Sequence, residues 1–385
     1  MMRSRKALRS VVATWAIVAL ALVVVGAPQA GPAAAKVTEI KLEAFGWHPP
    51  VPPHPGEIDS LGSQKLTIDS TGRVLVSFTV RGPNEELMRR SHPGLLLRIV
   101  RFGTDGRADL SLALPTDNWL GNGVYLDNHD RIVARADDKL LMPVRSPESG
   151  AGQIEWKTLA PCGPHCEVFE SLSRRTFYLD TWDADPPVTV LNMDDLSDIR
   201  HCQLPRGVRP ESFIGIRPNS ITDTFAYFNY APIGTGPVLY RWPLCDLSRR
   251  TQLPVVAHFF PVDAISDSLF LSGHDEYGSD GKLMRQISIK LSKHEDVGVG
   301  GVEGISANGE RLALTATTWK GGLAALDISS HMTAERVIVY DLARSKELAS
   351  IPIQPMWAIL HPAISPDGHR VAALVRATLT IADLP

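Results

Sequence analysis

ISPDGHRVAALV, residues 364–375, reads as the end of one strand, a tight turn and the start of a second strand. Asp and Gly are typical of turns that reverse the chain, and the Val, Ala and Leu that follow are typical of a strand. Three other stretches share the pattern: TIDSTGRVLVSF (67–78), YLDNHDRIVARA (125–136) and GISANGERLALT (304–315). This recurrence indicates a chain built from repeated antiparallel hairpins.

Short apolar runs bounded by Gly, Pro, Asn and Asp dominate the rest of the chain, and few stretches have a helical apolar period. The runs fall into groups of four strands at residues 64–115, 123–159, 167–205, 211–256, 262–297 and 301–353. The first strand of the fourth group is expected at 211–216, and the third strand of the fifth at 283–291. Self-similarity at intervals of roughly 40–60 residues with four strands per unit is typical of a β-propeller.

The two ends of the chain complete each other. Residues 362–385 supply only three strands, whereas KVTEIKLEAF (36–45) alternates as a strand should and belongs to no other group. Pairing the two would leave no open edge between the first and last blades. We therefore predict an all-β chain, a β-propeller of seven four-stranded blades closed by the N-terminal strand. Six or eight blades remain alternatives if the second or fifth group is misassigned.

The unit ISPDGHRVAAL and the stretch RVIVYDLARSKELASIPI (336–353) resemble repeats of exported bacterial propellers of the TolB and YVTN groups and, more distantly, of WD-repeat proteins. The resemblance is clearest in residues 301–385 and weakest in the middle of the chain. It implies architecture and not activity. The regular Gly-His to Trp-Asp pattern of WD repeats is absent, so WD-type partner recognition does not follow.

The N-terminus is typical of a secretory signal peptide. Four basic residues precede an apolar run from Val11 to Ala27, and Ala33 and Ala35 form an A-x-A cleavage site. We expect residues 1–35 to be removed, with an uncleaved membrane anchor as the alternative. Residues 36–385 would then form one propeller domain. It comprises a closing strand (36–45), a Pro-rich linker (46–63), blades one to six with their connections (64–357) and the last blade (358–385).

Removal of residues 1–35 leaves 35 basic and 42 acidic residues, a formal net charge of −7. An acidic chain without a basic block does not carry the electrostatic signature of a nucleic-acid-binding protein. We expect a secreted or periplasmic protein without stable membrane insertion after cleavage, and no cofactor.

The four cysteines indicate two disulfides, because an exported chain meets an oxidising compartment. The pairs expected are Cys162–Cys166 and Cys202–Cys245. A metal held by Cys162, His165 and Cys166 is the alternative, although a structural zinc site usually has four ligands.

No catalytic or nucleotide-binding motif is present: the chain has no G-x-S-x-G, H-E-x-x-H, G-x-x-x-x-G-K-[ST] or EF-hand loop. In a propeller, the loops between the second and third strands share one face with the blade connections. Long loops are expected on that face at 81–94, 182–187, 229–236, 273–281 and 319–335, joined by the connections 115–122 and 354–357. Long loops rich in aromatic and charged residues on a rigid scaffold are typical of binding surfaces.

The candidate ligand-binding residues all lie in these segments. They are Arg89, Arg90, His92, Trp119, Trp182, Asp183, Asp185, Tyr230, His274, Asp275, Glu276, Tyr277, Trp319 and Trp357. The tryptophans could equally pack between blades, and the charged groups could simply be solvated.

Three functional hypotheses follow. The first is a non-catalytic exported scaffold that binds a protein, peptide or glycan through the long loops. The second is a propeller enzyme, a hydrolase or lyase acting on a polysaccharide. Its acid/base or metal groups would be His274, Asp275 and Glu276 with the Asp183/Asp185 loop, converging at the channel mouth. The third is a structural envelope component.

Overall fold

The computed structural model describes residues 36–46, 65–81, 95–116, 123–145, 154–162, 166–181, 188–202, 220–230, 238–256, 262–272, 275–319, 332–353, 362–375 and 378–384. Contacts divide the chain into Met1–Ala34, which lies outside these residues, and Ala35–Pro385. The description that follows concerns the second unit alone.

The described strands form seven four-stranded antiparallel sheets, numbered here as blades 1–7. Blade 1 contains β2 (Lys65–Ile68), β3 (Val74–Arg81), β4 (Leu95–Phe102) and β5 (Ala108–Thr116). Blade 2 contains β6 (Gly123–Leu126), β7 (Ile132–Ala136), β8 (Lys139–Arg145) and β9 (Ile154–Pro161). Blade 3 contains β10 (Cys166–Glu170), β11 (Thr176–Thr181), β12 (Val188–Asn192) and β13 (Ile199–Cys202). Blade 4 contains β14 (Ser220–Ile221), β15 (Phe225–Tyr230), β16 (Val238–Pro243) and β17 (Thr251–Val256), with the short 3₁₀ helix η3 (Leu247–Arg249) before β17.

The remaining three blades complete the ring. Blade 5 contains β18 (Val262–Ser266), β19 (Leu269–Ser272), β20 (Asp275–Gly278) and β21 (Leu283–Gln286). Blade 6 contains β22 (Glu295–Ile305), β23 (Arg311–Trp319), β24 (Met332–Asp341) and β25 (Lys346–Ile353). Blade 7 contains β26 (Ala363–Ile364), β27 (Arg370–Val375), β28 (Thr378–Asp383) and, as its outer strand, β1 (Lys36–Lys41).

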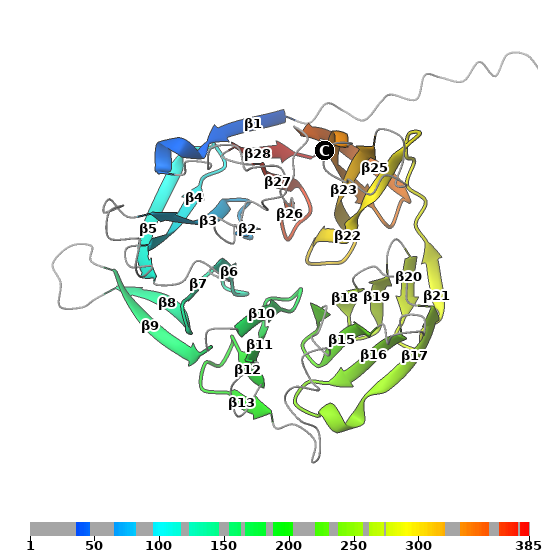
Figure 1. Cartoon of the computed structure of the whole chain (residues 1–385), viewed down its shortest axis with the longest axis horizontal. Helices are drawn as coiled ribbons and strands as arrows, with labels where there is room; N and C mark the ends of the chain where they lie inside the picture. The colour runs from blue at the N-terminus through cyan, green and yellow to red at the C-terminus, as the bar shows by residue number, and fades with distance from the viewer. Residues whose placement is uncertain are drawn as a thin grey trace, which may run out of the picture. The chain divides into compact units, whose positions relative to one another are not determined.

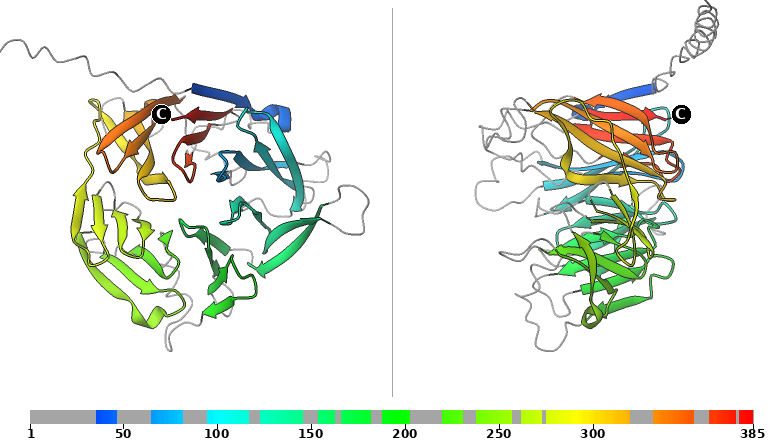
Figure 2. Two further views of the ribbon diagram at one scale, coloured as in Figure 1. Left: turned by 180° about the vertical axis from the view of Figure 1, so that it is seen from behind. Right: turned by 90° about the vertical axis from the view of Figure 1, so that its right-hand side faces the viewer.

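Figure 1 shows the seven sheets around a central axis, with the first strand of each nearest the centre. In the edge-on view of Figure 2 the strands run across the thickness of the disc. The prediction of a seven-bladed β-propeller is confirmed.

The N-terminal strand closes the ring as expected. β1 pairs antiparallel with β28 along its whole length, from Lys36 opposite Asp383 to Lys41 opposite Thr378. The expected strand at 36–45 is too long, however, because residues Leu42–Phe45 form the 3₁₀ helix η1. Its Leu42 is 1% exposed and packs into the core between blades 7 and 1. The turn after it ends at Gly46, whose φ of 90° suits a residue without a Cβ.

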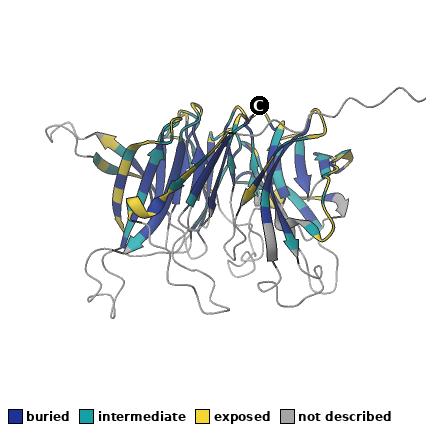
Figure 3. Cartoon of the chain, turned by 90° about the horizontal axis from the view of Figure 1, so that it is seen from above, coloured by how far each residue is buried: buried dark blue, intermediate teal, exposed yellow. Residues whose placement is uncertain are grey.

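Seven apolar clusters hold the described parts of the blades together, one at each junction between neighbouring blades. Because side chains alternate along a strand, one strand serves two junctions. Leu75 faces blade 2, whereas its neighbours Val74 and Val76 face blade 7. This explains why inner strands such as β11 are buried at consecutive positions, and Figure 3 shows buried residues along the middle of the sheets.

The turn repeat recognised in the sequence has a common hydrogen-bond pattern. At 365–370, the Ser365 hydroxyl accepts a hydrogen bond from the Arg370 amide at 2.9 Å. Asp69 does the same in blade 1, where its Oδ1 accepts from the amides of Thr71 and Arg73. Burial alone would raise the pKa of Asp69, but the hydrogen bonds from Thr71 and Arg73 outweigh it and lower the pKa. A polar first residue therefore fixes each of these turns.

The arginine that follows several of these turns ties its blade to the next. Arg370 Nη1 donates to the Gly72 carbonyl at 2.8 Å, which joins blade 7 to blade 1. Arg311 Nη1 donates to the Gly368 carbonyl at 2.7 Å, and Arg131 Nη2 to the Met193 carbonyl at 2.7 Å. The recurrent basic residue is thus explained by contacts between blades.

The strand assignment of blade 5 was wrong. The expected loop at 273–281 contains β20, and 283–286 form the fourth strand of the blade, not the third. Blade 6 also begins earlier than residue 301, at Glu295. The first strand expected for blade 4 at 211–216 lies outside the described residues, and the first strand there is β14.

Candidate functional site

The centre of the ring contains a cavity of about 730 Å³. All seven innermost strands (β2, β6, β10, β14, β18, β22 and β26) contribute to its lining. The lining also includes residues of the turns between first and second strands, such as Ser70, Asn128, Ser173 and Pro366. The cavity is therefore an axial channel that reaches the end of the ring formed by these short turns, which we call the short-turn face. Its volume lies in the range of about 300–1,000 Å³ typical of small-molecule sites.

Blades 1 to 3 give the cavity a charged wall. Lys65 on β2 lies over the ring of Tyr125 on β6, with Nζ 3.1 Å from the ring centroid. The same ammonium lies 4.0 Å from Oε1 of Glu170 on β10, and the two side chains are 30% and 28% exposed. The other carboxylate oxygen of Glu170, Oε2, is buried and accepts no hydrogen bond from the described residues.

A second contact joins the same three blades nearer the short-turn face. Arg174 has a positive φ of 61° and reaches from blade 3 to blade 1, where Nη2 donates to the Ile68 carbonyl at 2.7 Å. Its Nη1 lies 3.8 Å from Asp130 of blade 2, and Asp130 also accepts hydrogen bonds from the amide and hydroxyl of Ser70.

Arg135 and Glu167 add a third pair of opposite charges to this wall. Arg135 is 4% exposed, and burial lowers the pKa of its guanidinium, while the nearby Tyr125 and Glu167 act in the opposite direction. The charged wall thus consists of opposite charges in proximity, without a large excess of either sign.

Blades 6 and 7 provide a wall of different character. It is formed by Gly304, Ile305, Ala307, Pro362, Ile364 and Pro366. Ser220, Asp263 and Ala264 lie between the two walls, on blades 4 and 5. The channel is therefore charged on one side and apolar on the other.

Most of the predicted ligand-binding residues belong to the segments between the described ranges. Arg89, Arg90, His92, Trp119, Trp182, Asp183, Asp185, His274 and Trp357 lie outside the described residues, as do the side chains of Tyr230 and Trp319. The backbone places Tyr230 at the end of β15 and Trp319 at the end of β23. Their proposed role stays a prediction.

Asp275, Glu276 and Tyr277 are described, and they lie on β20, the third strand from the axis. Glu276 is 8% exposed, with Oε2 3.9 Å from Arg285 Nε, and Arg285 also donates to the Leu342 carbonyl of blade 6. The Tyr277 ring stacks on Phe270 at a centroid distance of 5.6 Å. Burial, followed by the nearby Asp275 carboxylate, raises the pKa of Tyr277. Glu276 and Tyr277 therefore take part in packing within and between blades, away from the channel.

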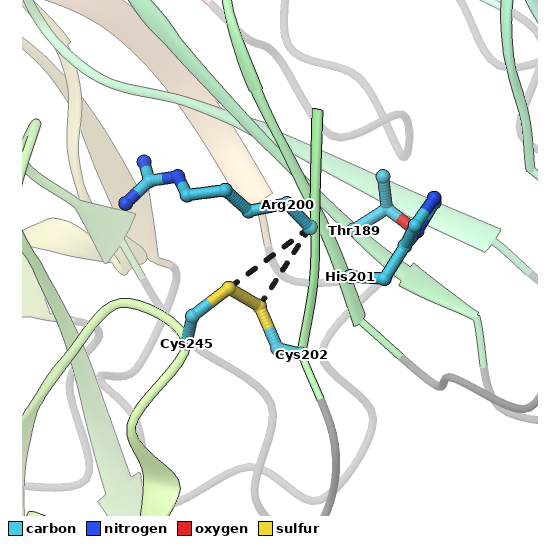
Figure 4. Close-up of a disulfide and its surroundings, with 5 residues drawn as sticks. All are labelled: Thr189, Arg200, His201, Cys202 and Cys245. Carbon is cyan, nitrogen blue, oxygen red and sulfur yellow. Dashed lines mark hydrogen bonds between the residues drawn. A yellow bond between two sulfur atoms is a disulfide. The ribbon is translucent and has the colours of Figure 1, made fainter. Parts of the chain in front are cut away.

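Both predicted disulfides are present, Cys162–Cys166 and Cys202–Cys245. The first closes the connection between blades 2 and 3. The second joins the outer strand β13 of blade 3 to the turn after β16 of blade 4, and its two sulfurs lie 3.9 and 4.0 Å from the Arg200 carbonyl oxygen (Figure 4). The described residues contain no free cysteine and no cluster of three or more potential metal ligands.

The sequence analysis missed Lys65, Glu167, Glu170 and Arg174. A signal was present, because Lys65, Glu167 and Glu170 are charged residues in the first strands of their groups. The first strand of each blade lines the axis, so a charge there points to the channel.

Comparisons with known proteins leave the family open. No protein-family model matches the chain, and no curated protein matches it. Among solved structures, the crystal structure of Kluyvelomyces marxianus Hsv2 is similar, with a TM-score of 0.38 and 12% identity. The similarity covers 82% of this chain and 90% of that chain. The resemblance to the TolB and YVTN groups stays a prediction, and the architecture itself rests on the strand pairing described above.

Proposed function

We propose that the chain is an exported, non-catalytic scaffold that binds a protein, peptide or glycan. The binding surface is the end of the ring opposite the short-turn face. It is formed by the connections 82–94, 182–187, 231–237 and 320–331, and we call it the long-loop face.

Strand geometry is the observation that carries this proposal. In an antiparallel blade, the connections between second and third strands all emerge at the same end of the ring. In blades 1, 3, 4 and 6 these connections leave β3, β11, β15 and β23 and span 82–94, 182–187, 231–237 and 320–331. In blades 2, 5 and 7 two residues are enough: 137–138, 273–274 and 376–377. Chain length beyond what a turn needs is easier to explain by recognition than by folding.

The ring provides a rigid base for such a surface. The described blades are joined by apolar clusters at every junction, by the arginine-to-carbonyl hydrogen bonds and by one disulfide between blades 3 and 4. Binding through loops on a rigid base avoids part of the entropy cost of ordering the scaffold.

The enzyme hypothesis is less well supported by the positions of the described residues. Glu276, on the third strand of blade 5, is paired with Arg285 on the fourth strand, so it lies away from the innermost strands that line the channel. Of the other groups proposed for acid/base chemistry, Asp275 lies next to Glu276 on β20, and His274, Asp183 and Asp185 lie outside the described residues.

Export is supported by the signal-peptide pattern and by the two disulfides, which form and persist in oxidising compartments. Among the described residues, no helix has the length and apolarity needed to cross a membrane. Intact-mass measurement on exported protein is expected to show a chain that starts at or near Lys36. A mass that retains residues 1–35 would favour the membrane-anchor alternative.

The binding proposal is tested with the purified mature chain on a glycan array and a displayed peptide library. Once a ligand is found, Trp182→Ala and Trp319→Ala are compared with Asp367→Ala on the short-turn face. We expect at least one tryptophan variant to lose about ten-fold or more in affinity, as aromatic anchors of binding surfaces do, while Asp367→Ala binds normally. Normal binding by both tryptophan variants, with loss in Asp367→Ala, would assign recognition to the short-turn face instead.

A further inference from the structure

In the charged wall of the axial channel, oppositely charged side chains lie near each other but beyond hydrogen-bond distance. Lys65 Nζ and Glu170 Oε1 are 4.0 Å apart, and Arg174 Nη1 and Asp130 Oδ1 are 3.8 Å apart. Both separations exceed the 2.7–2.9 Å typical of a charge-assisted hydrogen bond. Some pairs elsewhere are close, such as Arg73–Asp69 at 2.6 Å and Arg336–Glu295 at 2.5 Å, whereas the Arg285–Glu276 pair is 3.9 Å apart. The Lys65–Glu170 pair therefore keeps hydrogen-bonding capacity, whereas Arg174 donates to the Ile68 carbonyl and Asp130 accepts from Ser70.

Glu170 shows this most clearly. Its Oε2 is shielded from solvent and accepts no hydrogen bond from any described residue. Because Oε2 is enclosed, a ligand in the cavity contacts the Glu170 carboxylate through the part of the side chain that stays exposed, 28% of it. A ligand N–H group that donates there compensates for the hydrogen bond that the carboxylate lacks.

The pairing of charges decides which ligand fits. A simple cation at Glu170 would lie beside the Lys65 ammonium, and a simple anion at Lys65 would lie beside the Glu170 carboxylate. Each would meet one like charge at short range, which opposes binding. A ligand that carries both charges satisfies Glu170 and Lys65 together and leaves the net charge of the site unchanged.

The opposite wall selects the rest of the ligand. Ile305, Ala307 and Pro366 of blades 6 and 7 line the channel and are not fully buried, so they present apolar surface to it. An apolar group that is buried there gains about 25 cal/mol per Å² removed from water. The volume of about 730 Å³ accommodates an amino acid or a short peptide.

We propose that the axial channel binds a small zwitterion with an apolar side group, either a free α-amino acid or a dipeptide. The ligand's ammonium donates to Glu170, its carboxylate accepts from Lys65, and its side group packs against Ile305 and Pro366. This site is separate from the long-loop face, so it does not depend on the proposed macromolecular partner.

Isothermal titration calorimetry on the purified mature chain tests the proposal with L-leucine and leucyl-leucine as probes. N-acetyl-leucine lacks the ammonium, and leucinamide lacks the carboxylate. We expect at least one of the two zwitterions to bind. N-acetyl-leucine and leucinamide are each expected to bind about ten-fold or more weakly than the zwitterion, because each loses a charged hydrogen bond. If leucine binds more tightly, the ligand is a free amino acid, and if leucyl-leucine binds more tightly, it is a dipeptide.

Two variants assign the contacts. Glu170→Gln is expected to weaken zwitterion binding about ten-fold or more, and to reduce the difference between leucine and N-acetyl-leucine. Lys65→Met is likewise expected to weaken zwitterion binding, and to reduce the difference in affinity between leucine and leucinamide. Glu39→Gln, an exposed carboxylate on β1, is the matched control and should bind as the parent chain does. Thermal unfolding of each variant confirms that it is folded.

Absence of binding by both zwitterions at millimolar concentration overturns the proposal. So does equal binding of leucine, N-acetyl-leucine and leucinamide, or full binding by folded Glu170→Gln. Trp182→Ala is expected to keep its affinity for the zwitterion. A failure of the long-loop proposal is therefore distinguishable from a failure of this one.

Discussion

The two disulfides are expected to contribute unequally to stability. In the chain-entropy description, a disulfide stabilises the fold by restricting the unfolded chain, and the effect grows with the length of the loop that it closes. Cys202 and Cys245 are separated by 43 residues, which gives about 4 kcal/mol. Cys162 and Cys166 are separated by 4, which gives about 2 kcal/mol.

The test compares two double variants, Cys202→Ala/Cys245→Ala and Cys162→Ala/Cys166→Ala, with the parent chain by urea denaturation. The free energy of unfolding is expected to fall by about 4 kcal/mol in the first and about 2 kcal/mol in the second. Three of the four cysteines are 2% exposed or less, so both variants lose buried sulfur atoms and each partly controls for the other.

Two results would refute this reasoning. One is a loss in Cys162→Ala/Cys166→Ala as large as that in Cys202→Ala/Cys245→Ala. The other is a free energy of unfolding of the parent chain that stays the same after both disulfides are reduced. Reduction removes the restriction on the unfolded chain, so the reasoning requires this free energy to fall.

Three further predictions concern the ring. Deletion of residues 36–41 is expected to expose the edge of β28 and to lower both solubility and the melting temperature, and an unchanged melting curve would contradict closure by β1. Gly309→Ala is expected to be more destabilising than Gly46→Ala in urea denaturation, by about 1–3 kcal/mol. Both glycines have positive φ, but only at Gly309 would a Cβ meet a neighbouring side chain, Ile265 Cγ2 at 2.3 Å. The hydrogen bond from Arg336 lowers the pKa of Glu295 to about 2, so its stabilising effect is complete above the ordinary value of 4.5 and is lost as the pH falls toward 2. Glu295→Gln is therefore expected to be less stable than the parent chain at neutral pH, and the difference should shrink in acid.

The repeat pattern was enough to predict the ring and its closure. Turns with a polar first residue and a following arginine are local features, and the missing outer strand of the last blade pointed to the unused strand at the N-terminus. Blade 5 was misassigned because Asp275–Gly278 contains two acidic residues and a glycine, a composition typical of loops. Contacts from distant residues, Arg285 on Glu276 and Phe270 on Tyr277, hold this segment as a strand.

The sequence signals the channel residues only as charges in first strands, and the site that they form together was missed for a related reason. Lys65, Tyr125 and Glu170 belong to three blades, and only the ring brings their side chains together. Each residue alone reads as an ordinary charged or aromatic position. The end of β1 was similarly hidden, because alternation continues through residues 42–45 although they form a 3₁₀ helix.

The central claim is that recognition occurs on the long-loop face, and photo-cross-linking in exporting cells tests it most directly. A photoreactive phenylalanine analogue replaces Trp182 or Trp319 on that face, and Asn308 or Asp367 on the short-turn face. The account predicts cross-links to a common partner from positions 182 or 319, and none to that partner from 308 and 367. Cross-links from 308 or 367 alone would contradict it.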